Sequence, residues 1–175
     1  MPVRTLFPGV FLSVFLAFLV CSTPSCATPR AVEGEVTRVA DGDTLTLVTR
    51  EGTKLKVRLY GIDAPEIRHK ELPGQPYGKE ARAALAELAL GRRVTVEIVD
   101  IDTHKRMVGI VRRSGEDINL AMVRSGYAWA YRRYLSAPYA SEYIAAEKEA
   151  RSKRLGLWKE ANPDPPWNFK RRNRH

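Results

Sequence analysis

Short segments of alternating apolar and polar residues, separated by turn dipeptides, occupy residues 33–60 and constrain the fold of this 175-residue chain most strongly. Such alternation is typical of strands with one buried face, and an Asp-Gly pair favours a tight hairpin turn. The segments are Gly34–Val39, Thr44–Val48 and Lys54–Tyr60, and the turn pairs are Asp41-Gly42 and Glu51-Gly52. We therefore expect a three-stranded antiparallel meander.

Helical and strand patterns alternate along the rest of the chain. Residues 77–90 repeat apolar side chains on one helical face, and Gly91 is placed to end this helix. Further strands are expected at 93–101 and 107–113, a short helix at 119–125 and a longer one at 138–154, with Tyr143, Ala146 and Ala150 facing inward. This order fits an α+β fold, a five-stranded OB-fold barrel with about three α-helices. Other α+β layouts would give a similar order.

The length suits one compact domain, which we place at residues 31–160, with a short segment at each end. Residues 161–175 contain three prolines, Trp167 and a basic run from Lys170 to Arg174. This Pro-rich basic C-terminal tail is expected to be loosely packed rather than folded.

The first 27 residues have the layout of a secretory signal peptide. Arg4 is followed by an apolar run over residues 10–20 and then by Ser25-Cys26-Ala27, a small-x-small site. The run is shorter than the roughly 20 apolar residues that a membrane anchor needs. A lipoprotein is the other alternative, but neither cysteine follows a suitable small-residue box. We expect cleavage after Ala27, no stable membrane insertion, and a secreted or periplasmic protein.

Removal of residues 1–27 would leave a basic protein without cysteine. Both cysteines lie in that segment, so the stability of the mature chain would come from an ordinary core. Arg4 is the segment's single charged residue, so the formal net charge of +9 falls to +8. Such an excess favours nucleic acid, anionic lipid surfaces or acidic cell-wall polymers as partners. A solvated charge excess without a partner is the alternative.

Two carboxylates flank a proline where the third strand of the meander ends. Packing of the strand does not explain two carboxylates, Asp63 and Glu66, at this position, and Pro65 stiffens the backbone between them. Carboxylate and carbonyl oxygens suit Ca²⁺ or Mg²⁺. Asp41-Gly-Asp43 alone is ordinary turn chemistry. Three histidines and no mature cysteine make a transition-metal site a poor alternative.

Arg58 lies five residues before Asp63. The planar guanidinium of Arg58 can hold two phosphate oxygens, although strand arginines more often pair with carboxylates. Phosphodiester hydrolysis needs an activated water, a cation against the non-bridging oxygens, and donors for the transition state. The residues of this segment can supply all three.

Five motifs, in order and with compatible spacing between Glu33 and Trp158, resemble the staphylococcal nuclease (thermonuclease) family. They are Asp41–Thr44, Arg58–Glu66, Gly74–Ala81, Asp102–Arg106 and Leu155–Trp158. The resemblance implies Ca²⁺ held by the carboxylates of Asp43 and Asp63 and the carbonyl of Ala64. It implies Glu66 as the residue that activates water, and Arg58 and Arg106 as the phosphate clamp. It also implies hydrolysis of both DNA and RNA, with 3′-phosphate ends; we expect a monomer.

The chain departs from this family at two places. His104-Lys105 stands where a Tyr-Gly pair often precedes the second arginine, which puts the loop around Arg106 in doubt. Tyr134 matches one tyrosine that faces the terminal nucleotide, whereas Arg132 stands at the other, with Tyr131 beside it. We take Tyr131 and Tyr134 as substrate-binding residues. Aromatic side chains that merely cover the core are the alternative.

Two other classes of protein fit parts of the pattern. One is a catalytically silent OB-fold protein that binds nucleic acid or other polyanions, and the other is a wall-associated protein anchored by its basic tail. Because the complete set of carboxylates and arginines is present, the sequence favours the enzyme.

Overall fold

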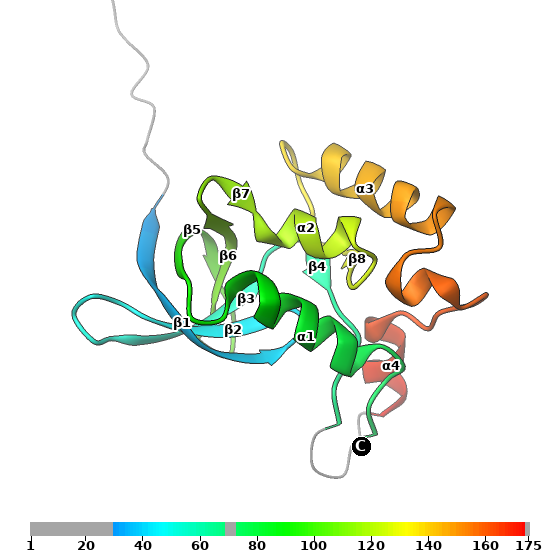
Figure 1. The fold of residues 1–175 in the computed structure, drawn as a ribbon, viewed down its shortest axis with the longest axis horizontal. Helices are drawn as coiled ribbons and strands as arrows, with labels where there is room; N and C mark the ends of the chain where they lie inside the picture. Colours follow the sequence, from blue (N-terminus) through cyan, green and yellow to red (C-terminus); the bar gives the residue numbers. More distant parts are fainter. Residues whose placement is uncertain (1–29, 69–72, 174–175) are drawn as a thin grey trace, which may run out of the picture.

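The computed structural model describes residues 30–68 and 73–173 (Figure 1). The predicted signal peptide, both cysteines, His69 and His175 lie outside these residues. Within them, no helix combines the length and the apolar character needed to cross a membrane.

Five strands form a closed barrel, which confirms the α+β OB-type prediction. They are β1 (Ala31–Asp41), β2 (Thr44–Val48), β3 (Lys54–Leu59), β5 (Arg93–Ile101) and β6 (Met107–Arg113). The sheet order is β3-β2-β1-β5-β6, and a parallel pairing of β3 with β6 closes it. The expected meander is correct, because β1, β2 and β3 pair antiparallel in sequence order. A two-residue strand, β7 (Glu116–Asp117), extends the β6 edge.

The barrel core consists of the apolar side of the alternating pattern. The side chains exposed by 4% or less alternate along β2 and β3, and a register shift spaces them by three residues in β1: Val36, Val39, Leu45, Leu47, Val57 and Leu59. Helix α1 (Gly78–Ala89) covers this core with Ala81, Leu85 and Ala89. Figure 1 shows α1 lying across the barrel. Burial of this periodic apolar set is the main driving force for the fold.

The helices after the barrel support a second, smaller pair of strands. Helix α2 (Ile118–Arg124) begins at Asp117, which accepts a hydrogen bond from the Leu120 amide, and α3 (Ala140–Ser152) packs against α2. Tyr143, Ala146 and Ala150 are buried, as predicted. The short strands β4 (Ile62–Asp63) and β8 (Trp129–Ala130) pair antiparallel, which places Asp63 beside Trp129. A 3₁₀ turn, η1 (Gly156–Lys159), follows α3.

The expectation of a loosely packed tail is wrong for the described part of residues 161–175. Helix α4 (Pro166–Arg172) is a fourth α-helix beyond the three expected, with Pro166 in its first turn. Trp167 packs against a second apolar cluster made of Trp129, Ala150, Leu157 and Trp158. Figure 1 shows α4 beside the start of α1. Helix α4 therefore belongs to the fold.

Candidate active site

Arg58 joins two buried carboxylates at one end of the barrel. In the β2–β3 hairpin Thr44 lies opposite Arg58, which brings the preceding Asp43 next to this arginine. One guanidinium nitrogen of Arg58, Nη2, donates to Asp63 Oδ1 at 2.7 Å, and the other, Nη1, pairs with Asp43 Oδ2. Asp43 and Asp63 are 3% and 1% exposed. Buried charges need such partners, since an unpaired carboxylate loses its hydration.

The hairpin turn holds Asp43 against the residues that follow β4. Asp43 Oδ2 accepts a hydrogen bond from the Ala64 amide at 2.9 Å, and Asp43 Oδ1 accepts one from Thr44 Oγ1 at 3.0 Å. A Cβ at Gly42 would lie 2.6 Å from the Cβ of Ala64, so only glycine allows this approach. The structure thus brings together Asp43, Asp63 and Ala64, the three residues predicted to hold a metal ion.

Asp41 is a further carboxylate of this cluster that the sequence interpretation treated as turn chemistry. Its Oδ1 accepts a hydrogen bond from the Asp43 amide at 3.0 Å. Burial raises the pKa of the Asp41 carboxyl, against the opposing charges of Arg58, Lys170 and Arg106. The spacing Asp-x-Asp was the available signal, but it does not distinguish a turn from a site.

The backbone of Glu66 is fixed on both sides while its side chain points into a more open region. Gln75 accepts a hydrogen bond from the Glu66 amide at 3.0 Å, and the Gln75 amide donates to the Glu66 carbonyl at 2.8 Å. A Cβ at Gly78 would lie 2.3 Å from that carbonyl oxygen, so the start of α1 packs directly on Glu66. The Glu66 side chain is 30% exposed. This geometry gives the carboxylate a defined position and access to water.

A lysine of α4, absent from the sequence prediction, reaches the same carboxylates. Lys170 Nζ lies 2.7 Å from Glu66 Oε1 and donates to Asp63 Oδ1 at 3.0 Å. No short-range pattern signals this contact, since Lys170 follows Asp63 by more than one hundred residues.

Arg106 lies in the loop before β6, where it pairs with Asp102. Its Nε and its amide donate to the two Asp102 oxygens at 2.7 and 2.9 Å. Burial acts to raise the pKa of Asp102, but the hydrogen bonds from Arg106 and His104 outweigh burial and lower it. Lys105 has a φ of 59°, the left-handed conformation that favours glycine. A tight turn thus forms with His104-Lys105 before Arg106.

The loop also lies at the edge of the barrel near Arg58. In the parallel β3–β6 pairing, Val57 is opposite Met107 and Arg58 is opposite Val108. The ion pair that Arg106 makes among the described residues is with Asp102, not with Asp43 or Asp63. The structure therefore places Arg106 near the centre without aiming its guanidinium at it.

Tyr131 and Tyr134 follow β8 and form an aromatic pair. Their rings meet edge to face at 5.0 Å, and Tyr134 is 57% exposed. The Tyr131 amide donates to the Gly61 carbonyl at 2.8 Å, which holds the segment next to β4. Trp167 of α4 stacks on Tyr131 with 5.1 Å between centroids and 2° between planes. Neither tyrosine belongs to the innermost core.

Arg132, which stands where a second tyrosine was expected, points to a structural carboxylate. It pairs with Glu147, whose side chain is 1% exposed and accepts a hydrogen bond from the Ala130 amide. Arg151 pairs with the same carboxylate. This network anchors β8 to α3, so Arg132 helps to hold the segment between Tyr131 and Tyr134 against α3.

The donor set fits a hard divalent cation. Four carboxylates, those of Asp41, Asp43, Asp63 and Glu66, share the centre with the two cations Arg58 and Lys170. Among residues 30–68 and 73–173, no group of three or more His, Cys, Asp or Glu side chains is arranged so that it could hold a metal ion by itself. Two carboxylates completed by a carbonyl and water are ordinary ligation for such ions.

Comparison with known proteins identifies the family. The profile described as "Staphylococcal nuclease homologue" matches residues 56–160, more than half of the chain. The chain belongs to the staphylococcal nuclease family. The match spans Arg58, Asp63, Glu66 and Arg106, the residues around the barrel end described above.

Two of three relatives of this staphylococcal nuclease homologue carry nuclease names. It is 37% identical to "Micrococcal nuclease" of Shigella flexneri over 166 residues, which cover 90% of this chain and 89% of that one. It is 34% identical to an "Uncharacterized endonuclease" of Haemophilus influenzae over 139 residues, 79% and 73% of the two chains. "Protein ParB" of Escherichia coli is 39% identical over 165 residues, 89% and 87%. The protein is an endonuclease that hydrolyses nucleic acid.

Proposed function

We propose that this protein is an exported, Ca²⁺-dependent nuclease that cleaves DNA and RNA with little sequence specificity and leaves 3′-phosphate ends. The observation that carries the proposal is the single guanidinium of Arg58 held between the buried carboxylates of Asp43 and Asp63, with Lys170 joining Asp63 to Glu66. A phosphate diester bound there would meet cations and a carboxylate base within one small volume.

In this proposal the chain's own groups divide the chemistry among them. Asp43, Asp63 and the Ala64 carbonyl hold Ca²⁺, which supplies positive charge against the non-bridging oxygens of the phosphate. Glu66 accepts a proton from the attacking water, which requires an ionised, water-accessible carboxylate. Arg58 and Arg106 donate to the phosphate oxygens, where charge accumulates in the five-coordinate transition state.

The aromatic pair supports the proposed lack of sequence specificity. Tyr134 offers an exposed ring beside Tyr131, and stacking accepts any base because every base has a π face. The net positive charge supports binding to the backbone, which is also independent of sequence. We further propose a monomer that is exported through residues 1–27 and acts in the periplasm or outside the cell.

Product analysis tests the reaction itself. The purified protein is incubated with denatured DNA and, separately, with RNA in the presence of Ca²⁺, and the product ends are labelled with and without prior phosphatase treatment. We expect digestion of both polymers, 5′-hydroxyl ends that a kinase labels directly, and 3′ ends that a polymerase extends only after phosphatase treatment. Ends that carry 5′-phosphate would contradict the proposed direction of cleavage.

Arg106 provides the most informative single substitution outside the motif Arg58–Glu66. In Arg106→Ala, kcat is expected to fall by about 10²-fold or more because a transition-state donor is lost. The free energy of unfolding should fall by about 1 kcal/mol or less, since the pair with Asp102 is partly exposed. Steady-state cleavage and thermal unfolding measure both effects. Unchanged kcat would remove Arg106 from the phosphate clamp.

A further inference from the structure

Helix α4 places an ammonium group inside the carboxylate centre. Lys170 Nζ lies 3.0 Å from Asp63 Oδ1 and 2.7 Å from Glu66 Oε1, and its side chain is 34% exposed. The family profile ends at residue 160, and the five sequence motifs end at Trp158, so neither of them includes this lysine. One ammonium group thus pairs with both the proposed metal ligand Asp63 and the proposed base Glu66.

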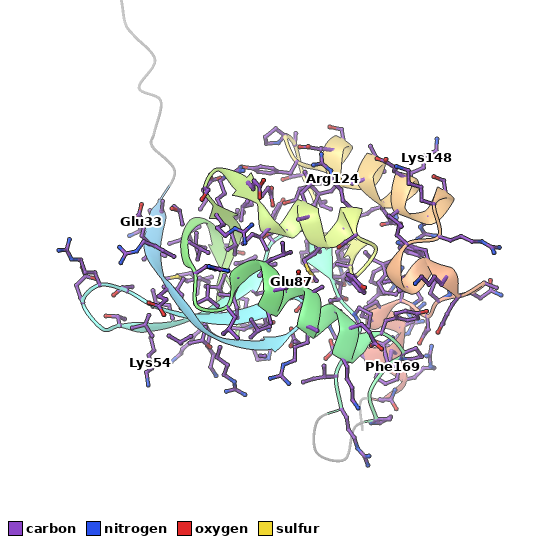
Figure 2. All side chains as sticks on the ribbon, in the orientation of Figure 1. Glu33, Lys54, Glu87, Arg124, Lys148 and Phe169 are labelled. Atoms are coloured by element: carbon purple, nitrogen blue, oxygen red, sulfur yellow. The ribbon has the colours of Figure 1, made fainter. Side chains whose placement is uncertain are left out.

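Tertiary contacts anchor the helix that carries Lys170. Trp167 stacks on Tyr131 and meets the edge of Trp129 at 6.3 Å. Gln75 Nε2 donates to the Asp164 carbonyl at 3.0 Å, so the amide that fixes the Glu66 backbone also fixes the start of α4. Figure 2 shows the side chains of α4, with Phe169 labelled, gathered beside the start of α1. The position of Lys170 is therefore held by the fold.

We propose that Lys170, which pairs with Asp63 and Glu66, is a further residue of the active site, and that it competes with the divalent cation for Asp63. The inference rests on the proposed function, because it concerns the same carboxylates. If both were bound to the Asp63 carboxylate, the divalent cation and the Lys170 ammonium would lie within about 6 Å of each other. Even in a medium with the dielectric constant of water, a +1 and a +2 charge at that distance disfavour joint binding by about tenfold.

The same helix also covers part of the proposed stacking surface. The indole of Trp167 lies parallel to the Tyr131 ring, as a nucleobase stacked there would. Helix α4 thus contacts the carboxylates of the site through Lys170 and the aromatic pair through Trp167. In our proposal, Lys170 and the divalent cation are alternative partners of the Asp63 carboxylate.

Calorimetric titration with CaCl₂, in the absence of nucleic acid, tests the competition directly. Lys170→Met removes the competing charge while keeping an unbranched side chain. We expect it to bind Ca²⁺ about tenfold or more tightly than the unmodified protein. Lys170→Arg keeps the charge and should bind within about threefold of the unmodified protein, because the effect depends on charge.

Arg171→Met is the matched control, since it removes one positive charge from the neighbouring position of α4. Arg171 is exposed and contacts Asn168 rather than Asp63 or Glu66. The calcium affinity of Arg171→Met should therefore stay within about threefold of that of the unmodified protein. Thermal unfolding in chelator confirms that each variant is folded. Equal or weaker affinity in Lys170→Met would overturn this inference alone. Absence of calcium binding in both the unmodified protein and Lys170→Met would overturn this inference and the proposed function together.

Discussion

Replacement of Arg58 by methionine is expected to lower the rate of cleavage by about 10³-fold or more, since a well-placed arginine contributes this much in phosphoryl transfer. The same change should lower the free energy of unfolding, measured in chelator, by about 3–5 kcal/mol. The physical reason is that the Asp43 and Asp63 side chains are 5% and 2% exposed and lose their shared partner. Single-turnover cleavage and urea-induced unfolding measure the two effects.

Arg112→Met provides the matched control for this double effect. Arg112 pairs with Glu97, but that pair is 29% and 25% exposed and lies on the barrel wall between β5 and β6. We expect about 1 kcal/mol or less of destabilisation and unchanged cleavage. If Arg58→Met cleaved DNA within tenfold of the unmodified protein, Arg58 would be a structural counterion and not a phosphate ligand.

Conversion of Glu66 to glutamine is expected to lower kcat by about 10²-fold or more, because an amide cannot accept the proton of the attacking water. The fold should be retained, since Gln75 holds the Glu66 backbone through main-chain groups that the change leaves intact. Calcium affinity should change much less than kcat, because Asp43 and Asp63 supply the proposed ligand carboxylates. Calorimetry and single-turnover kinetics separate binding from chemistry.

Glu80→Gln is the control for loss of one negative charge near this site. Glu80 lies exposed in the first turn of α1, a few residues after Gln75. Its variant should cleave at the rate of the unmodified protein. A Glu66→Gln variant with near-normal kcat would mean that a bound cation alone activates the water, and Glu66 would lose the role assigned to it.

Much of the barrel follows from patterns that are local in the sequence. Alternating apolar residues define β1, β2 and β3, and the turns Asp41-Gly42 and Glu51-Gly52 set the hairpin connections. Arg58, Asp63 and Glu66 lie in one short segment, so their proximity needs little long-range information. The hairpin pairing of Thr44 with Arg58 then brings Asp43 to the same place. These parts of the site are accessible to sequence reasoning because their determinants lie close together in the chain.

Helix α4 could not be predicted in the same way. A helix of seven residues has little stability of its own, and the prolines and basic residues around it are typical of a flexible end. Its order comes from partners far away in sequence, chiefly Tyr131, Trp129 and Gln75. The pairing of Arg106 with Asp102 was missed for another reason, because a loop spacing does not specify where a side chain points.

The most direct measurement of the central claim is cleavage of denatured DNA by the purified protein as a function of free Ca²⁺. Our account predicts no cleavage in chelator, restored cleavage on addition of Ca²⁺, and loss of that response in an Asp43→Asn, Asp63→Asn double variant. Equal cleavage with Ca²⁺ and with chelator, or calcium-dependent cleavage by the double variant, would contradict the assignment of this carboxylate centre.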